Sequence, residues 1–335
     1  MRLLVIKLSS LGDVIHALPA LTDAAQQFPE LHCDWVVEEG LAEVPAWHAA
    51  ANNIFSVALR RWRKQFPRKW PGQEWRSFKQ LVQANQYDHV IDAQGLLKSA
   101  WLSRLAHGTR HGLNRHSARE PSASWFYHHK HDVPWGQHAV ERVRQLFATA
   151  LGYSVPDTPP NYGLHQFASP KSDKNPMLIF FHGASWESKC WPESYWIELA
   201  ERAIADKCQV RLPWGNEVER ERAQRIADAT SASVLPSTNL HGMAQEISQA
   251  HAVIGVDTGL SHLAAALGVP SITMYGPTQP DWTGTLGPSQ QHAKAEFPCA
   301  PCLNRTCQFK GVSSVQPACY QMLPPHKIYG MLEKV

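Results

Sequence analysis

Short apolar and β-branched runs alternate with helix-like patterns along most of this 335-residue chain. Strands are predicted at 3–8, 33–37, 54–58 and 89–93 in the first half, and at 177–181, 209–212, 252–256 and 271–274 in the second. Apolar residues recur at helical spacing between these runs. Such alternation is typical of a mostly parallel sheet covered by helices, so the predicted fold class is α/β.

A stretch rich in Pro, Ser and Asp interrupts the pattern at about 157–175, and the alternation resumes after it. A chain of this length can bury two ordinary cores. We therefore predict two Rossmann-like doubly wound domains, 1–165 and 166–324, that face a central cleft. An amphipathic closing helix, 325–335, is expected to cross back to the N-terminal domain.

Composition limits the classes of function. The formal net charge of +3 is too small to indicate general binding to nucleic acid. Only a short apolar run precedes Lys7, and no later stretch approaches the roughly 20 apolar residues of a membrane span. The expected location is the cytoplasm.

Seven cysteines, an odd number, favour reduced thiols over a disulfide framework. Four of them gather near the end of the chain: Cys299, Cys302, Cys307 and Cys319. Their spacing is only partly that of metal ligands and does not match the paired Cys-x-x-Cys of a zinc ribbon. No metal site is predicted, and structural zinc on these four residues is the alternative.

The first predicted strand leads through a small, flexible segment into Asp13. Apolar spacing then indicates a helix, so Asp13 falls at or near a helix start, where the helix dipole favours a carboxylate. The residue can be an N-cap, a catalytic base, or both. The Ser9-Ser-Leu-Gly lead-in at a strand end favours a functional role.

In the second half, a strand runs into Asp257-Thr-Gly-Leu-Ser-His262 and then into a helical pattern. Backbone N–H groups at Thr258 and Gly259 would point out of a helix N-terminus, which suits a phosphate. Asp257 could hold sugar hydroxyls. The alternative is an ordinary capped helix with a surface histidine.

Two further strand ends carry candidate ligands of a nucleotide. Ser185 and Lys189 follow one strand, and a cation there suits a departing diphosphate, although a solvated surface lysine is the alternative. Glu219 follows the next strand and could accept hydrogen bonds from ribose hydroxyls, or it could lie on a solvated helix face.

A basic cluster follows the third predicted strand: Arg60, Arg61, Arg63 and Lys64, with Trp62 among them. Guanidinium groups match carboxylates and phosphates bidentately, which fits an anionic acceptor. Nucleic acid, a membrane surface or a solvated basic loop are the alternatives. The chain has no P-loop, no Gly-x-Gly-x-x-Gly after a strand and no Asp-x-Asp pair, which argues against kinases, dehydrogenases and metal-dependent sugar transferases.

Together the motifs resemble those of the ADP-heptose lipopolysaccharide heptosyltransferase family, from Met1 to about Gly276. They are Lys7-Leu-Ser-Ser-Leu-Gly-Asp13, Asp34-Trp-Val-Val-Glu-Glu-Gly40, Arg60-Arg-Trp-Arg-Lys64, Asp92-Ala-Gln-Gly-Leu-Leu-Lys98, Ala118-Arg-Glu-Pro121, Gln137-His-Ala-Val-Glu-Arg142, Pro213-Trp-Gly215 and Asp257-Thr-Gly-Leu-Ser-His262. Where relatives often carry two threonines in the diphosphate loop, this chain has Ala184-Ser185.

The resemblance implies a GT-B fold and an inverting, metal-independent transfer without a cofactor, in which ADP-L-glycero-D-manno-heptose is a substrate. It implies Asp13 as the base, Lys189 and Ser185 on the diphosphate, and Glu219 on the ribose. Heptose and phosphates would contact Asp257, Thr258, Gly259 and His262. Acceptor anions would bind Arg60, Arg61, Arg63 and Lys64, helped by Lys98 and Arg119.

The implied acceptor is the Kdo of Kdo–lipid A, reached from the cytoplasmic face of the inner membrane by a peripheral enzyme that binds no nucleic acid. Two alternatives remain open. One is heptosyltransferase II or another core-sugar transferase. The other is a non-catalytic protein that binds a nucleotide sugar.

Overall fold

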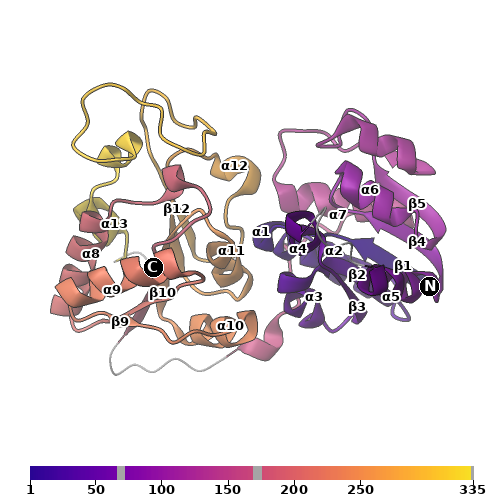
Figure 1. The fold of residues 1–335 in the computed structure, drawn as a ribbon, viewed down its shortest axis with the longest axis horizontal. Coiled ribbons are helices and arrows are strands. Elements are labelled where there is room, and N and C mark those ends of the chain that lie inside the picture. Colours follow the sequence, from indigo (N-terminus) through magenta and orange to yellow (C-terminus); the bar gives the residue numbers. More distant parts are fainter. Residues whose placement is uncertain (66–71, 169–175, 333–335) are drawn as a thin grey trace. The chain divides into compact units, whose positions relative to one another are not determined.

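The computed structural model describes residues 1–65, 72–168 and 176–332. The chain divides into two compact units, Met1–Leu164 and His165–Val335. Residues 169–175 of the predicted linker and 333–335 of the predicted closing segment lie outside the described residues. Figure 1 labels the elements of both units.

The N-terminal unit is built on a six-stranded sheet of order β3-β2-β1-β4-β5-β6, in which neighbouring strands are parallel. The strands are β1 (Arg2–Ile6), β2 (His32–Glu38), β3 (Ala51–Val57), β4 (Gln86–Asp92), β5 (His107–Leu113) and β6 (His129–His131). The helices are α1 (Leu11–Ile15), α2 (Leu18–Gln27), α3 (Glu43–Ala46), α4 (Leu59–Gln65), α5 (Gly72–Gln83), α6 (Leu97–Ser103) and α7 (Ala139–Leu151), with 3₁₀ turns η1 (Glu39–Leu41) and η2 (Pro121–Phe126).

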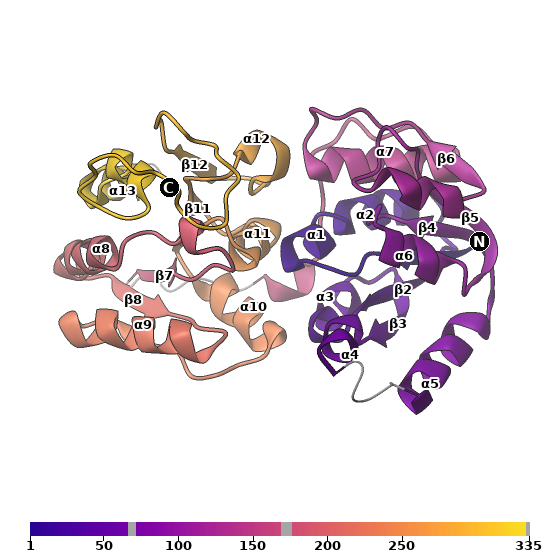
Figure 2. The same ribbon diagram turned by 45° about the horizontal axis from the view of Figure 1, so that its top comes forward.

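Helices cover both faces of this sheet. Successive side chains of a strand point to opposite faces, so each strand contributes to both layers of the core. Leu4 and Ile6 of β1 pack in one cluster with Phe78 of α5 and Leu102 of α6. On the opposite face α2 and α7 pack together, and α7 contacts β4, β5 and β6 (Figure 2). Strands buried on both faces explain the continuous apolar run Leu3-Leu-Val-Ile6.

The C-terminal unit repeats this plan with the order β12-β11-β10-β7-β8-β9, again with parallel neighbours. Its strands are β7 (Met177–Phe181), β8 (Gln209–Leu212), β9 (Ser233–Val234), β10 (Ala252–Val256), β11 (Ser271–Tyr275) and β12 (Gln290–Lys294). Its helices are α8 (Glu193–Ala205), α9 (Glu217–Ala229), α10 (Leu240–Gln249), α11 (Gly259–Ala266), α12 (Pro280–Thr283) and α13 (Pro325–Leu332), with 3₁₀ turns η3 (His165–Phe167), η4 (Glu187–Lys189) and η5 (Ala318–Met322).

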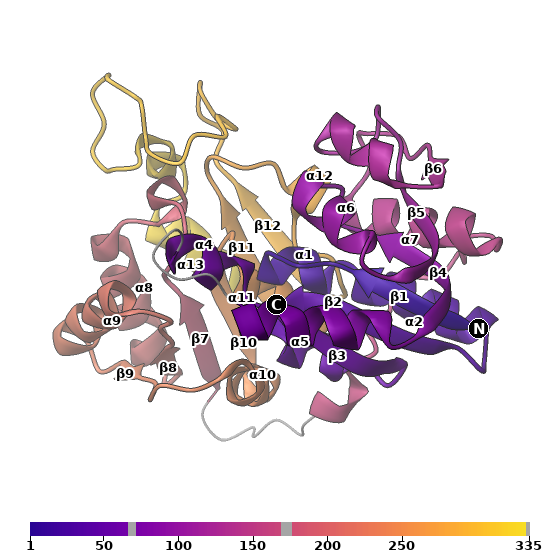
Figure 3. The ribbon, with the colours of Figure 1, turned by 45° about the vertical axis from the view of Figure 1, so that its right-hand side comes forward.

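Helices α8 and α9 cover one face of this second sheet, and α10 and α11 cover the other (Figure 3). Phe180 of β7 packs with Trp196 of α8 and Ile226 of α9 in one buried cluster. The prediction of an α/β chain with two doubly wound parallel sheets is confirmed.

The helix α13 packs against α8 and β11 of the C-terminal unit, where Ile328 is fully buried in the same cluster as Phe180. The predicted crossing to the N-terminal domain stays a prediction. Among the described residues, no helix combines the length and hydropathy needed to cross a bilayer.

Candidate active site

In each sheet the strand order reverses between two central neighbours, β1 and β4 in the first and β7 and β10 in the second. Ligands of doubly wound sheets bind beyond the carboxyl ends of the strands at this reversal. Asp13 follows β1, Lys189 follows β7 and Asp257 follows β10. The predicted catalytic pair and most predicted donor ligands therefore lie at the switch point of their own sheet.

Asp13 is partly exposed in the first turn of α1. The helix is capped by Ser10, whose backbone N–H and hydroxyl donate to Asp13 Oδ2 at 2.7 and 2.9 Å. Asp13 is thus the third helical residue of a capping box, and is not the N-cap itself. Both bonds fall on one oxygen, which leaves Oδ1 without a hydrogen-bond partner among the described residues.

Gln94 fixes the segment that carries Asp13. The residue lies within a motif of the sequence analysis, where it had no predicted role. The buried Gln94 Oε1 accepts hydrogen bonds from the backbone N–H groups of Leu8 at 3.1 Å and Ser9 at 3.2 Å. The N–H groups of Leu8 and Ser9, just after β1, have no backbone partner in a neighbouring strand. The side-chain carbonyl of Gln94 accepts from both of them. A glutamine two residues after a predicted strand was the available signal.

Lys7 is a second residue that the sequence analysis did not select. It is 6% exposed, and its Nζ donates to the carbonyl of Ala93 at 2.7 Å. Burial lowers the pKa of Lys7, while the negative charges of Asp13 and Asp92 oppose that shift. Lys7 thus joins the segment after β1 to the segment after β4 through its bond to Ala93.

Asp92, the last residue of β4, is fully buried. It accepts hydrogen bonds from the backbone N–H groups of Gln94 and Gly95 and from the hydroxyls of Ser99 and Tyr127, at 2.6 to 3.2 Å. Burial raises the pKa of Asp92, and these four donors counteract the shift. With both oxygens engaged, Asp92 organises the loop after β4 and does not compete with Asp13 as a base.

The basic cluster lies in α4. Its cations are either exposed to solvent or paired with carboxylates. Arg60, Arg63 and Lys64 are exposed. Arg61 instead bridges Glu39 and Glu74, with N–O distances of 2.8 to 3.3 Å. Trp62 is 9% exposed and donates its indole N–H to Glu74 at 2.8 Å, so it belongs to the core and is not an exposed stacking surface.

The two predicted helpers of the N-terminal unit are both exposed. Lys98 lies in the first turn of α6, just after the loop that follows β4, and Arg119 lies in the loop before η2. Glu120 ties these loops together. Its N–H donates to the carbonyl of Gly95 at 3.2 Å, and its carboxylate accepts from the N–H of Leu97 at 2.6 Å.

In the C-terminal unit, Asp257 is the centre of a buried polar cluster and is 6% exposed. Its Oδ2 pairs with Lys189 Nζ at 2.7 Å and accepts from the Thr278 hydroxyl at 2.7 Å. His262 Nε2 lies 3.6 Å from Oδ1. Burial alone would raise the pKa of Asp257, but bonding to His262 and the charge of Lys189 outweigh it and lower the pKa. The carboxylate stays ionised.

This cluster joins three of the predicted donor residues and adds Thr278, which the sequence analysis missed. His262 is 7% exposed, so the alternative of a surface histidine is wrong. Thr278 belongs to the segment after β11, the next strand of the sheet, and a hydroxyl at that strand end was the available signal.

Lys189 ends the turn η4, and its backbone is fixed from another part of the unit. The Tyr320 hydroxyl donates to the carbonyl of Lys189 at 2.6 Å. The Lys189 ammonium also lies 4.8 Å from the ring centroid of Trp186, within the range of a cation–π contact. Ser185 is exposed one residue before Trp186.

The helix after β10 begins where the motif predicted. Thr258 is the N-cap of α11 and Gly259 its first residue, and both are partly exposed. The buried Ser261 hydroxyl donates to the carbonyl of Val256 at 2.7 Å, which anchors the first turn to the strand end. The amide-lined end of α11 is thereby held beside Asp257.

Glu219 lies in the first turn of α9, capped by Asn216. Its carboxylate accepts from the N–H of Gly215 at 2.8 Å. A Cβ at Gly183 would lie 2.7 Å from Glu219 Cδ, so the Glu219 side chain packs closely over this glycine. The structure therefore brings Glu219 against the loop that leads to Ser185 and Lys189.

A family model described as glycosyltransferase family 9 (heptosyltransferase) matches residues 75–313. Lipopolysaccharide heptosyltransferase 1 of Pseudomonas aeruginosa is 52% identical over 99% of this chain and 97% of the relative. The chain belongs to glycosyltransferase family 9. It is an α/β glycosyltransferase of the heptosyltransferase type.

Solved structures agree with this family assignment. E. coli heptosyltransferase WaaC with ADP-2-deoxy-2-fluoro heptose superposes with a TM-score of 0.85 at 42% identity, covering 100% of this chain and 99% of that one. E. coli ADP-heptose lps heptosyltransferase II gives a TM-score of 0.74 at 20% identity, over 100% and 98% of the two chains, and shares the fold. The predicted GT-B class of this heptosyltransferase is confirmed.

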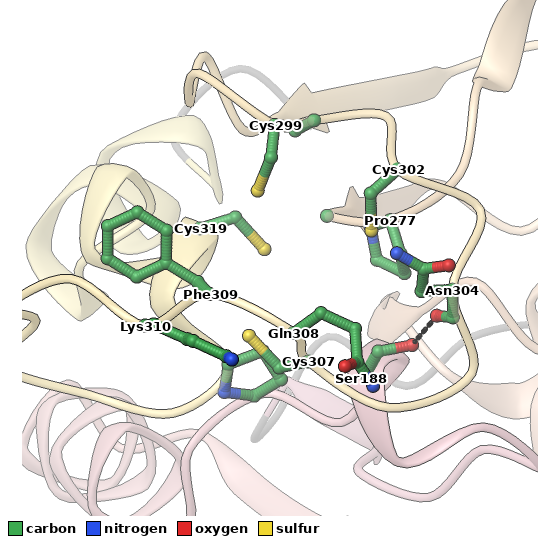
Figure 4. A pocket seen from close by; sticks show the side chains of 13 residues that line it. Ser188, Pro277, Cys299, Cys302, Asn304, Cys307, Gln308, Phe309, Lys310 and Cys319 are labelled. Atoms are coloured by element: carbon green, nitrogen blue, oxygen red, sulfur yellow. Dashed lines mark hydrogen bonds between the residues drawn. The ribbon is translucent and has the colours of Figure 1, made fainter.

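The four tail cysteines of this heptosyltransferase are free thiols. All four line one cavity of about 290 Å³ in the C-terminal unit (Figure 4). Among the described residues, no group of three His, Cys, Asp or Glu side chains is already arranged to hold a metal ion.

Proposed function

We propose that this chain transfers L-glycero-D-manno-heptose from ADP-heptose to the Kdo of Kdo–lipid A. The observation that carries the proposal is the 52% identity to a lipopolysaccharide heptosyltransferase 1 over 99% of the chain. Heptosyltransferase 2 of E. coli K12 is 32% identical over only 38% of the chain. The difference favours the heptose-free inner core as acceptor.

The donor would bind in the C-terminal unit. The first turn of α11, at Thr258 and Gly259, offers amide N–H groups to the diphosphate, and Lys189 adds a cation. Glu219 would accept from the ribose hydroxyls beside Gly183. Asp257, held ionised, would accept from heptose hydroxyls with His262 alongside.

The reaction we propose is one in-line displacement with inversion at the anomeric carbon. Asp13 accepts the proton of the attacking Kdo hydroxyl on Oδ1, since Oδ2 is already engaged by Ser10. Lys189 and the N-terminus of α11 stabilise the negative charge that develops on the departing ADP. This chemistry needs no metal ion.

The acceptor would bind through the exposed cations of the N-terminal unit. The carboxylate of Kdo and the phosphates of lipid A match the guanidinium and ammonium groups of Arg60, Arg63 and Lys64. Lys98 and Arg119 extend this charge beside the loops that Asp92 organises. Arg61 contributes by holding α4 between Glu39 and Glu74.

We further propose that the enzyme works peripherally at the cytoplasmic face of the inner membrane, where its lipid acceptor resides. The N-terminal unit exposes Trp101, Trp125 and Trp135 at 47%, 79% and 56%. Indole rings favour the headgroup region of a bilayer, so these side chains suit contact with a lipid surface.

ADP release tests the proposal against its rivals. Purified protein is given ADP-heptose with no acceptor, with heptose-free Kdo–lipid A, or with the mono-heptosylated lipid, and ADP is measured over time. The proposal expects ADP only with the heptose-free lipid. Release with the mono-heptosylated lipid would indicate heptosyltransferase II activity, and tight donor binding without release under any condition would indicate a binding protein.

A further inference from the structure

The arginines of the C-terminal unit differ in whether a carboxylate pairs with them. The unit contains six arginines, and five of them form salt bridges with N–O distances of 2.5 to 3.9 Å: Arg202, Arg211, Arg220, Arg222 and Arg225. Arg305 is the sixth. It is exposed, and no carboxylate among the described residues pairs with its guanidinium group. Its charge is therefore available to an anionic ligand.

Arg305 lies in the long loop between β12 and η5, and its backbone is fixed to the turn η4. The Ser188 N–H donates to the carbonyl of Arg305 at 3.0 Å. The Ser188 hydroxyl donates to the carbonyl of Asn304 at 2.5 Å, the bond drawn in Figure 4. Ser188 directly precedes Lys189, so these two bonds hold the base of the Arg305 side chain beside the turn that carries Lys189.

The guanidinium group of Arg305 also lies near the segment after β7. Its central carbon is 5.7 Å from the ring centroid of Trp186, and Lys189 Nζ is 4.8 Å from the same centroid. Both distances fall within the range of cation–π contacts. Two cations therefore gather at one indole ring, and one of them is the lysine that the proposed mechanism places on the diphosphate.

The charge of Lys189 is already balanced by the protein. Its Nζ lies 2.7 Å from Asp257 Oδ2, and the lowered pKa of Asp257 keeps that carboxylate ionised, so the pair carries no net charge. Each phosphate of a nucleotide sugar is negative. When the bond between the anomeric carbon and the phosphate oxygen breaks, its electron pair adds a further negative charge to the departing ADP. The amides of a helix N-terminus supply only partial positive charge against it.

We propose that Arg305 is a further donor-binding residue, whose guanidinium group binds the diphosphate of ADP-heptose beside Lys189 and stabilises the charge of the departing ADP. A guanidinium group donates two parallel hydrogen bonds to phosphate oxygens, which an ammonium group cannot do. Trp186 acts as a positioning residue, because its ring holds this otherwise solvated side chain near η4. The inference rests on the donor site proposed above and adds a cation to it.

Calorimetric titration of the full-length chain with ADP, without acceptor, is the first test. Arg305→Gln should weaken ADP affinity about tenfold at low salt, because charge-assisted hydrogen bonds to phosphate are lost. Arg305→Lys keeps the charge and should lose about threefold or less. Lys310→Gln removes an exposed cation of the same loop and should bind ADP as the wild type does. Equal ADP affinity in wild-type and Arg305→Gln protein would overturn the proposal.

Salt dependence separates contact with the phosphates from a structural role of the loop. Between about 0.05 and 0.5 M NaCl, the difference in ADP affinity between wild type and Arg305→Gln should shrink several-fold, because salt screens an exposed charge. A difference that is the same at both salt concentrations would show that Arg305 acts only through the structure of the loop, and the proposal would fail.

Kinetics test the second part of the proposal. With saturating ADP-heptose, Arg305→Gln should lower kcat on the order of tenfold, since the charge on ADP grows as the bond to heptose breaks. An unchanged kcat would overturn the stabilisation of departing ADP. The proposed function fails separately: wild-type protein that binds no ADP, or that binds ADP and transfers no heptose, contradicts that function, whereas normal transfer by Arg305→Gln contradicts only the role of Arg305.

Discussion

Asp13 and Asp257 follow central strands, β1 and β10, at the switch points of two sheets with the same topology, but their surroundings differ. Asp13 is partly exposed, and only Ser10 bonds to its carboxylate, on one oxygen. Asp257 is 6% exposed and is contacted by Lys189, Thr278 and His262. The two switch points thus differ: one has a carboxylate with an oxygen left to accept a proton, and the other has a carboxylate fixed in its charged state.

This difference separates two tasks. A general base needs an oxygen within reach of the proton it removes. A residue that holds sugar hydroxyls needs a permanent charge in a fixed place, which burial beside a cation supplies. In the proposed mechanism, proton transfer therefore falls to the N-terminal unit and donor binding to the C-terminal unit.

The largest effect is expected at the base. Asp13→Asn keeps the size of the side chain and removes its ability to accept the proton, so kcat should fall by roughly 10²- to 10⁴-fold. Initial rates of ADP release measure kcat, and calorimetric titration measures ADP affinity, which should be unchanged. A variant with wild-type kcat would show that Asp13 is not the base.

A loss of both stability and ADP affinity is expected at the buried carboxylate Asp257. Lys189→Met leaves Asp257 without its cation, and an unpaired buried charge costs about 3–5 kcal/mol of unfolding free energy. Urea unfolding would show the loss, and ADP affinity should fall as well. The double variant Lys189→Met with Asp257→Asn should regain stability but not ADP affinity, and a stable single variant would contradict the pairing.

Acid should destabilise the fold through histidines that burial keeps neutral. Burial, and then the charge of Arg222, lower the pKa of His182 to about 4, whereas the unfolded value is near ~6.5. The unfolded chain therefore gains the proton first, and stability falls as the pH drops from about 6.5 towards 4, by up to ~3 kcal/mol.

His48 in the N-terminal unit has a pKa lowered to about 4 by burial alone, so it is the matched case. Urea unfolding at several pH values, with His182→Leu and His48→Leu, measures how much each histidine contributes to the fall in unfolding free energy at low pH. Each variant should flatten the decline. A slope that neither substitution changes would mean that other groups cause the acid sensitivity.

A smaller effect is expected from Gln94→Leu. The substitution leaves the buried N–H groups of Leu8 and Ser9 without their acceptor, at a cost of about 1–3 kcal/mol. Because these residues lead to Asp13, kcat should drop while ADP affinity stays the same. Gln94→Glu, which keeps the acceptor oxygen, should recover part of kcat, and an equal loss in both variants would point to a purely structural role.

The smallest effects are expected on α4. Arg63→Ala and Lys64→Ala should each raise the acceptor KM a few-fold, most at low salt, because exposed charges contribute only about 0.2–1 kcal/mol. Neither should alter ADP affinity. Arg61→Ala, which breaks the bridge between Glu39 and Glu74, should lower stability slightly, and a larger KM effect than Arg63→Ala would reverse the division proposed for this helix.

The sequence predicted the central strands well because strands buried on both faces consist of continuous apolar runs. The run 177–181 coincides with β7. The strands it missed lie at or near a sheet edge: β5, β6, β9 and β12. They are rich in His, Gly or Gln, or only two residues long, so they show no continuous apolar run.

Residues of the candidate site were predicted where a motif follows a strand. They were missed where a contact joins segments that follow different strands. Asp13, Lys189 and Asp257 each follow a recognisable strand-to-helix turn. Gln94 and Thr278 act on residues far away in the chain, and no local pattern specifies those partners.

The most direct test of the account is the mass of the lipid product. Wild-type protein is incubated with ADP-heptose and Kdo–lipid A, and the extracted lipid is analysed by mass spectrometry. The account predicts a gain of a single heptose that depends on the donor and is lost in Asp13→Asn. A lipid of unchanged mass, or one that gains heptose equally with the Asp13→Asn protein, would contradict it.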